Sequence, residues 1–249
     1  MADPAVVAER QQAQSRSLIL SLIALPFHVF GALCGSLLVS ILIECLGVHF
    51  LWPEQGWRHA QSMLTYELEQ VSRDFTRSVV IHEPARTAQW LVESTYDWIF
   101  VESGLGERLR EASTRSAAST ARTFSDLRDY VDYAYPHVEN YVLAAVYTLL
   151  VFLVRLLVLC LTLPLFVMAA IVGFVDGLVR RDIRRFGAGR ESGFIYHRAK
   201  ATLVPLLVLP WVIYLALPVS VSPLLILLPS AVLLGLAVNI ATSSFKKYL

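Results

Sequence analysis

Basic side chains gather in one short stretch of this chain, between residues 176 and 200. From Gly177 to Lys200 the sequence has seven Arg and Lys residues against two acidic ones, a net charge of about +5. Guanidinium groups bind phosphates and carboxylates through paired hydrogen bonds, and the run 194–197 adds aromatic side chains. The candidate docking residues for a partner protein or for lipid headgroups are Arg180, Arg181, Arg184, Arg185, Gly187, Gly189, Arg190, Glu191, Tyr196, His197 and Lys200.

No familiar catalytic motif accompanies this basic stretch. The sequence contains no P-loop, G-x-S-x-G, H-E-x-x-H or C-x-x-C pattern. The glycines between Gly187 and Gly193 resemble a dinucleotide-binding loop, but the third glycine comes one residue late and no strand precedes it. The histidines lack the spacing of metal ligands. We therefore expect a protein that is not an enzyme and that holds no cofactor and no metal.

Three ionisable residues lie in or beside apolar blocks, which makes them candidates for a polar path through a membrane. They are His28, Glu44 and Arg155. His28 and Glu44 are too far apart on one helix to form one site, because sixteen residues span about 24 Å. Glu44 could instead pair with Arg155. A charge-lined path would favour a small transporter or channel.

The composition indicates a membrane protein. Hydrophobic residues make up 56% of the chain and charged residues 16%, whereas soluble domains carry about 25% charged residues. The charges are missing from four blocks, each long enough for a helix that crosses a bilayer. The predicted fold is all-α: a polytopic membrane protein with about four transmembrane helices and a helical periplasmic segment between the first and second.

The charge-free blocks give the predicted boundaries. The first block is too long for the core of a cleavable signal peptide, so we predict an uncleaved anchor. Arg155 divides the second block and is expected to extend to the outer membrane interface. In order, the segments are an N-terminus at 1–16, a first transmembrane helix at 17–48, the helical segment at 49–140, a long helix at 141–175 whose transmembrane part is near 156–175, a basic loop at 176–200, a third transmembrane helix at 201–217, a turn at 218–223, a fourth transmembrane helix at 224–243 and a C-terminus at 244–249.

The distribution of charge predicts the topology. Loops rich in Lys and Arg stay on the cytoplasmic side of a membrane, which places the 176–200 loop there. Residues 49–140 hold 9 Arg and 14 acidic residues, a net charge of about −5, and are expected on the opposite side. With four spans, both termini would then be cytoplasmic.

Small residues at helical spacing predict where helices approach one another closely. Gly31 and Gly35 lie in the first span, and Gly173 and Gly177 lie in and just after the second. These residues are predicted to pack helices within one bundle. The Gly31–Gly35 face could also pair two copies of the chain into a homo-oligomer.

The run from Arg184 to Lys200, RRFGAGRESGFIYHRAK, resembles the hallmark loop of a family of bacterial inner-membrane proteins. Integrating conjugative elements encode this family, near the gene for the conjugative coupling ATPase. The resemblance extends over essentially the whole chain, including one N-terminal span, a helical outer segment and three further spans. It implies a part in conjugative DNA transfer through a type IV secretion-like apparatus, and it supplies no catalytic residue.

Two functional hypotheses follow. The first is a non-enzymatic component of the conjugation machinery in the bacterial inner (cytoplasmic) membrane, which would act as an accessory or scaffold for the coupling ATPase. Its partners would be the lipid bilayer, that ATPase and other transfer proteins, without direct contact to nucleic acid. The alternative is a small inner-membrane transporter or channel, although the sequence lacks the internal inverted repeat that many transporters have.

Overall fold

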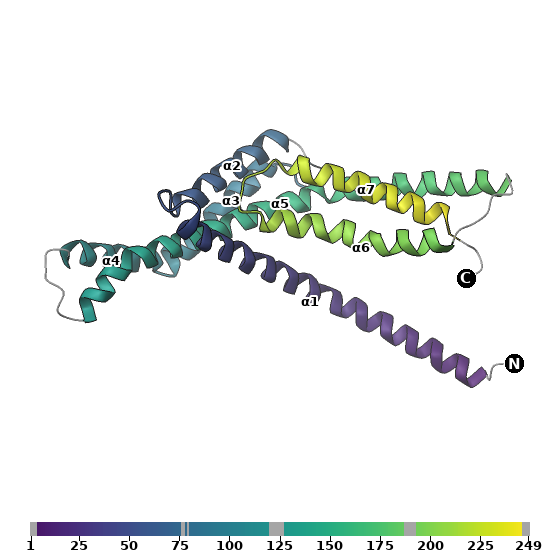
Figure 1. Cartoon of the computed structure of the whole chain (residues 1–249), viewed down its shortest axis with the longest axis horizontal. Coiled ribbons are helices and arrows are strands. Elements are labelled where there is room, and N and C mark those ends of the chain that lie inside the picture. The colour runs from purple at the N-terminus through teal and green to yellow at the C-terminus, as the bar shows by residue number, and fades with distance from the viewer. Residues whose placement is uncertain (1–3, 76–77, 79, 120–126, 187–192, 246–249) are drawn as a thin grey trace.

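The computed structural model describes residues 4–75, 78, 80–119, 127–186 and 193–245. Within these ranges the chain is entirely helical and has no strand. The elements in chain order are α1 (Pro4–Phe50), α2 (Arg58–Asp74), α3 (Pro84–Asp97), the π-helical turn η1 (Trp98–Glu102), α4 (Leu105–Ser119), α5 (Leu127–Phe186), α6 (Gly193–Ala216) and α7 (Pro223–Ser243), as Figure 1 shows.

Within the described chain, four stretches of helix are long and apolar enough to cross a membrane. They are Val29–Phe50 in α1, Val138–Arg184 in α5, Tyr196–Ala216 in α6 and Pro223–Ser243 in α7. Many large apolar side chains on these helices face outward, as on surfaces that contact lipid rather than water. The predicted all-α fold with about four membrane-spanning helices is therefore confirmed.

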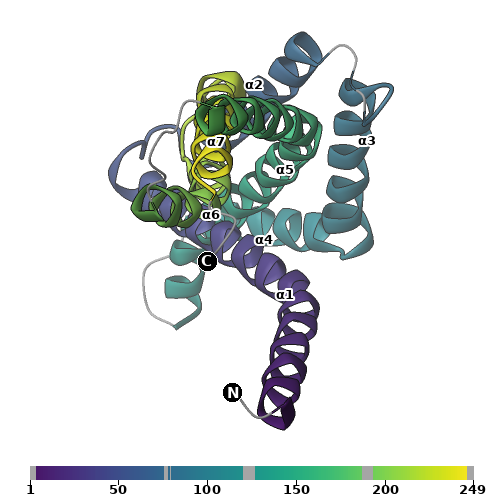
Figure 2. The ribbon, with the colours of Figure 1, turned by 90° about the vertical axis from the view of Figure 1, so that its right-hand side faces the viewer.

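Helices α5, α6 and α7 lie side by side and form the main bundle (Figures 1 and 2). Helices α5 and α7 run in the same direction and α6 runs in the opposite one. The hydrophobic core lies where α2 joins this bundle, and Leu150, Val154, Val158 and Leu227 are fully buried there. The bundle thus has two ends, one against α2 and the other where α5 ends and α6 begins.

The contact between α5 and α7 is very close. A Cβ atom at Gly173 would overlap the carbonyl oxygen of Gly235, and one at Gly177 would lie 2.8 Å from the carbonyl oxygen of Asn239. A Cβ at Gly235 would lie 2.8 Å from the carbonyl oxygen of Ala169. Glycine is therefore needed at these positions for the two backbones to meet.

Helix α1 meets the bundle only along part of its length. Its C-terminal part contacts α5 and α6, and its N-terminal half diverges from the bundle (Figure 1). Leu33 and Leu37 pack against the core. A Cβ added at Gly31 or Gly35 would meet no atom within 4 Å. Among the described residues, Gly31 and Gly35 are therefore not points of close helix contact.

Short helices fill the segment between α1 and α5. Helix α2 buries one face, and α3 begins with Pro84 at its first turn, where proline has no backbone donor to lose. Gly104 has φ +68° and separates η1 from α4. The apolar spacing from Leu64 to Val79 favours one helix up to Pro84, yet α2 ends at Asp74. The β-branched residues that follow, among them Val80 and Ile81, have low helix propensity.

Helix α5 has 60 residues, which is about 90 Å at 1.5 Å per residue. It includes the predicted 141–175 helix and continues beyond it at both ends. All of the described part of the predicted basic loop is also helical, because α5 continues to Phe186 and α6 begins at Gly193. The Asp176–Arg180 pair, at i,i+4 spacing, supports the added turns of α5.

Candidate functional site

The described basic residues of the 176–200 stretch meet at one end of the bundle, which we call the basic end. Arg180, Arg181, Arg184 and Arg185 lie on the last turns of α5, while Tyr196, His197 and Lys200 lie on the first turns of α6. Helix α7 ends at the same place (Figure 1). The other four predicted docking residues, Gly187, Gly189, Arg190 and Glu191, lie outside the described residues.

The side chains of the basic end differ in how they are paired. Arg180 is exposed and lies 3.1 Å from Asp176, whose carboxylate also accepts a hydrogen bond from the Asn239 amide. The Arg181 guanidinium lies over the Phe245 ring, 5.6 Å from its centroid. His197 and Lys200 are exposed. The basic end therefore presents cationic groups beside aromatic rings.

The opposite end of the bundle holds a buried cluster that the sequence analysis did not identify. Arg155 of α5 donates from Nε to Glu67 of α2 over 2.9 Å, and the Tyr214 hydroxyl of α6 donates to the other oxygen of Glu67 over 3.3 Å. The exposed fractions are 1% for Arg155, 0% for Glu67 and 1% for Tyr214. We call these three residues the buried cluster.

Backbone carbonyls complete the coordination of Arg155. Its terminal nitrogens donate to the carbonyl oxygens of Tyr214, Leu217 and Val219, at the end of α6 and in the α6–α7 turn. The guanidinium also lies 5.4 Å from the centroid of the Tyr214 ring. One arginine on α5 thus binds α2, α6 and the turn that leads into α7.

The electrostatics of the buried cluster indicate a structural role. Burial raises the pKa of Glu67, whereas the charge and hydrogen bond of Arg155 oppose that rise. Removing one partner of such a pair costs about 3–5 kcal/mol, because the other charge stays buried alone. Since no member is exposed by more than 1%, a substrate could not reach the cluster. It therefore joins α2 to the bundle.

These contacts correct one expectation about the charges in the apolar blocks. The predicted Glu44–Arg155 pair does not form. Instead, Glu44 Oε1 lies 3.0 Å from His59 Nδ1, and His59 stacks on Trp52 with ring centroids 3.9 Å apart. Glu44 and Arg155 thus have separate partners, and the two do not line one path.

A sequence signal for the buried cluster exists. The buried face of α2 consists of Ala60, Met63, Leu64, Glu67, Gln70 and Val71. This is an apolar stripe at helical spacing in which Glu67 takes a central position. A carboxylate inside one apolar stripe and an arginine inside another predict an ion pair between the two helices.

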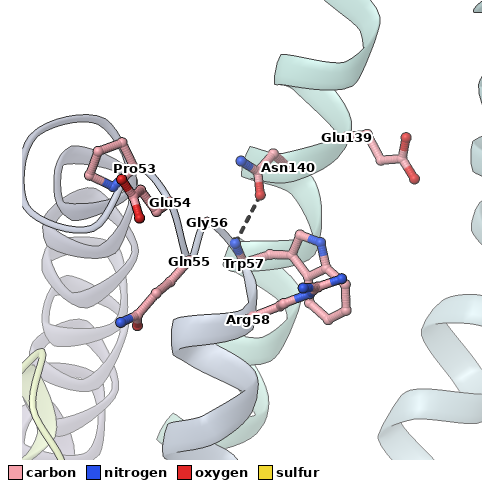
Figure 3. A pocket seen from close by; sticks show the side chains of 8 residues that line it. All are labelled: Pro53, Glu54, Gln55, Gly56, Trp57, Arg58, Glu139 and Asn140. Carbon is pink, nitrogen blue, oxygen red and sulfur yellow. Dashed lines mark hydrogen bonds between the residues drawn. The ribbon is translucent and has the colours of Figure 1, made fainter.

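A polar pocket of about 350 Å³ lies where the turn after α1 meets α5 (Figure 3). The Asn140 side chain accepts a hydrogen bond from the Trp57 backbone over 2.8 Å. Gly56 has φ +54°, and a Cβ there would lie 2.6 Å from Asn140 Oδ1. Glu54, Arg58 and Glu139 line the rest and present both signs of charge. Asn140 therefore holds this turn against α5.

The described part of the chain contains no group of three or more His, Cys, Asp or Glu side chains that could hold a metal ion.

Comparison with known proteins identifies the family. No curated protein and no solved structure gives a match to the chain. A family model described as "IncC plasmid conjugative DNA transfer protein DtrJ-like" matches residues 51–246, from the turn before α2 to just beyond α7. The match includes both the buried cluster and the basic end, and it confirms the expected link to conjugation. The chain therefore belongs to the DtrJ-like family of conjugative DNA transfer proteins.

Proposed function

We propose that this protein is a non-enzymatic component of a conjugative DNA-transfer apparatus, anchored in the bacterial inner membrane. The family supports the role in conjugative transfer. The observation that carries the molecular proposal is the position of the basic end. Arginines from α5 and basic side chains from α6 gather at one end of four apolar helices, while the acidic segment between α1 and α5 lies toward the other end.

The same charge distribution supports one orientation of the protein across the membrane. A cationic end belongs on the cytoplasmic side, so the basic end and both termini face the cytoplasm and α2, α3 and α4 lie in the periplasm. In this orientation the α6–α7 turn is periplasmic, and the Arg155 contacts to that turn support a buried cluster at the periplasmic side of the bundle. Arg155 is stable there because its charge is neutralised by Glu67 within the protein.

The basic end is proposed as the docking surface for a cytoplasmic partner, the coupling ATPase of a type IV secretion-like system. An integrating conjugative element, as well as a plasmid, could encode such a system. Arginines suit this role because they bind acidic side chains in fixed, bidentate geometry. In this arrangement the protein serves as an accessory or scaffold and performs no catalysis, and the helices α2–α4 are available to periplasmic channel proteins.

The test replaces Arg184, Arg185 and Arg190 with Ala in the parent conjugative system. Transfer frequency should fall by at least tenfold while membrane insertion and protein level stay unchanged. The matched control replaces Arg73, Arg86 and Arg108 with Ala, because these three exposed arginines lie away from the basic end, on α2, α3 and α4. Normal transfer by the first variant at full expression would contradict the docking proposal.

Crosslinking in cells addresses the partner directly. Lys200 is exposed at the start of α6, so an amine-reactive crosslinker should join it to the coupling ATPase in wild-type cells. The arginine variant should lose this crosslink, whereas the control variant should keep it. Recovery of self-links alone would exclude the ATPase as the docking partner.

A further inference from the structure

A cavity opens at the basic end, between the last turns of α5, the first turns of α6 and the end of α7. Its volume is about 380 Å³, and its lining includes Phe174, Leu178, Arg181, Tyr196, Ala241 and Phe245. Most of the lining is apolar, and one guanidinium lies at its edge. The combination is that of a site for a ligand with a charged head and an apolar body.

The lining residues of α5 are ordered along the helix axis. Phe174, Leu178 and Arg181 recur at intervals of four and three residues, so they share one face of α5. Seven residues span about 10 Å, which separates the apolar part of the cavity from the guanidinium. Phe174 is 50% exposed, so the cavity opens on the side of the bundle that faces lipid. A ligand could therefore enter laterally from the bilayer.

Arg180 pairs with the Asp176 carboxylate, whereas one donor of Arg181 has no acceptor among the described residues. Its Nε is buried and has no hydrogen-bond partner among the described residues. The nearby Asp176 carboxylate is taken by Arg180 and Asn239, and Asp182 is exposed. A buried donor without an acceptor is unfavourable, and a bound anion would supply the missing acceptor.

We propose that this cavity binds an anionic phospholipid. The phosphate accepts hydrogen bonds from Arg181 beside Tyr196 and Phe245, and an acyl chain lies against Phe174, Leu178 and Ala241. A free anion would not use the apolar lining, whereas a phospholipid uses both parts. Basic pockets between transmembrane helices on the cytoplasmic side bind anionic headgroups in this way. The inference goes beyond the proposed role in transfer, because it requires only that the bundle lies in a membrane.

Native mass spectrometry of the full chain in neutral detergent tests the proposal. One phosphatidylglycerol should be retained per protein, more tightly than phosphatidylcholine, and inorganic phosphate alone should not bind. Arg181→Gln should weaken phosphatidylglycerol binding about fivefold, the effect expected of one arginine near a headgroup. Arg73→Gln is the control, since it removes the same charge from an exposed arginine of α2 that does not line the cavity, and it should leave binding unchanged.

Three outcomes would overturn the proposal. If both substitutions weaken phosphatidylglycerol binding equally, the effect is one of general charge. If the two lipids bind equally well, the anionic headgroup has no role. If inorganic phosphate binds, the cavity is a site for soluble anions. If Arg181→Gln does not fold, wild-type protein still gives an answer. Phosphatidylglycerol with a diazirine in its acyl chain should label residues 174–181 or 241–245, and even labelling of all spans would contradict the site.

Discussion

The two ends of the α5–α6–α7 bundle differ in how completely their arginines are hydrogen-bonded within the chain. At the end against α2, Arg155 is 1% exposed and binds Glu67 and three backbone carbonyls. At the basic end, Arg180 has only an exposed pair with Asp176, and the buried Nε of Arg181 has no hydrogen-bond partner among the described residues. An arginine whose donors are satisfied within the chain fixes the fold, whereas incompletely paired arginines are available to ligands and partners.

The largest expected effect comes from the satisfied arginine. Arg155→Ala should lower the free energy of unfolding by about 3–5 kcal/mol, because Glu67 stays buried without its partner. Arg180→Ala should lower it by at most about 1 kcal/mol, because an exposed pair contributes little. Unfolding of the purified protein in detergent, followed by circular dichroism, measures both. If the two variants lose equal free energy of unfolding, Arg155 and Arg180 do not differ in their contribution to stability.

A substitution between the two ends should have an intermediate effect. Gly173→Ala puts a methyl group against the Gly235 carbonyl, and overpacking of this kind costs about 1–3 kcal/mol. Gly31→Ala is the matched control, because nothing lies within 4 Å of its added Cβ, and alanine is the better helix former. Thermal midpoints in detergent compare the two. A loss on Gly31→Ala as large as that on Gly173→Ala would show that α1 packs there after all, for example against a second copy.

A third comparison concerns the other partner of the buried cluster. Glu67→Gln removes the counter-charge of Arg155 but keeps a hydrogen-bond acceptor, so it should cost less than Arg155→Ala. Its amide oxygen can still accept from Arg155, whose other donors keep their carbonyl partners. The raised pKa of Glu67 also indicates that burial disfavours its charged form. Glu67→Ala leaves a cavity and should cost more, and the same unfolding measurement should rank the two.

The sequence analysis predicted those features that depend on local pattern. Uncharged blocks of sufficient length predict membrane-spanning helices whatever they contact, and the arginine run alone placed the basic end next to two such helices. The run also supported the family, which the match to residues 51–246 confirms. The predicted docking role of the individual arginines stays a prediction.

Features that depend on pairing between distant segments were not predicted. Glu67 and Arg155 are separated by 88 positions, and their contact depends on how α2 folds back onto α5. The sequence analysis offered Glu44 as the partner because it considered apolar blocks alone. The small residues of α5 and α7 were visible in the sequence, but only the structure shows that Gly173 faces Gly235. A Cβ at Gly31 meets no atom of the described residues within 4 Å.

The length of α5 limits which molecules can contact both ends of the protein at once. From Leu127 to Arg184 the helix extends about 85 Å along its axis, whereas a small globular domain is about 30 Å across. A single compact domain bound at the basic end therefore cannot reach the start of α5. Simultaneous contact at both ends requires either two separate partners or one elongated assembly.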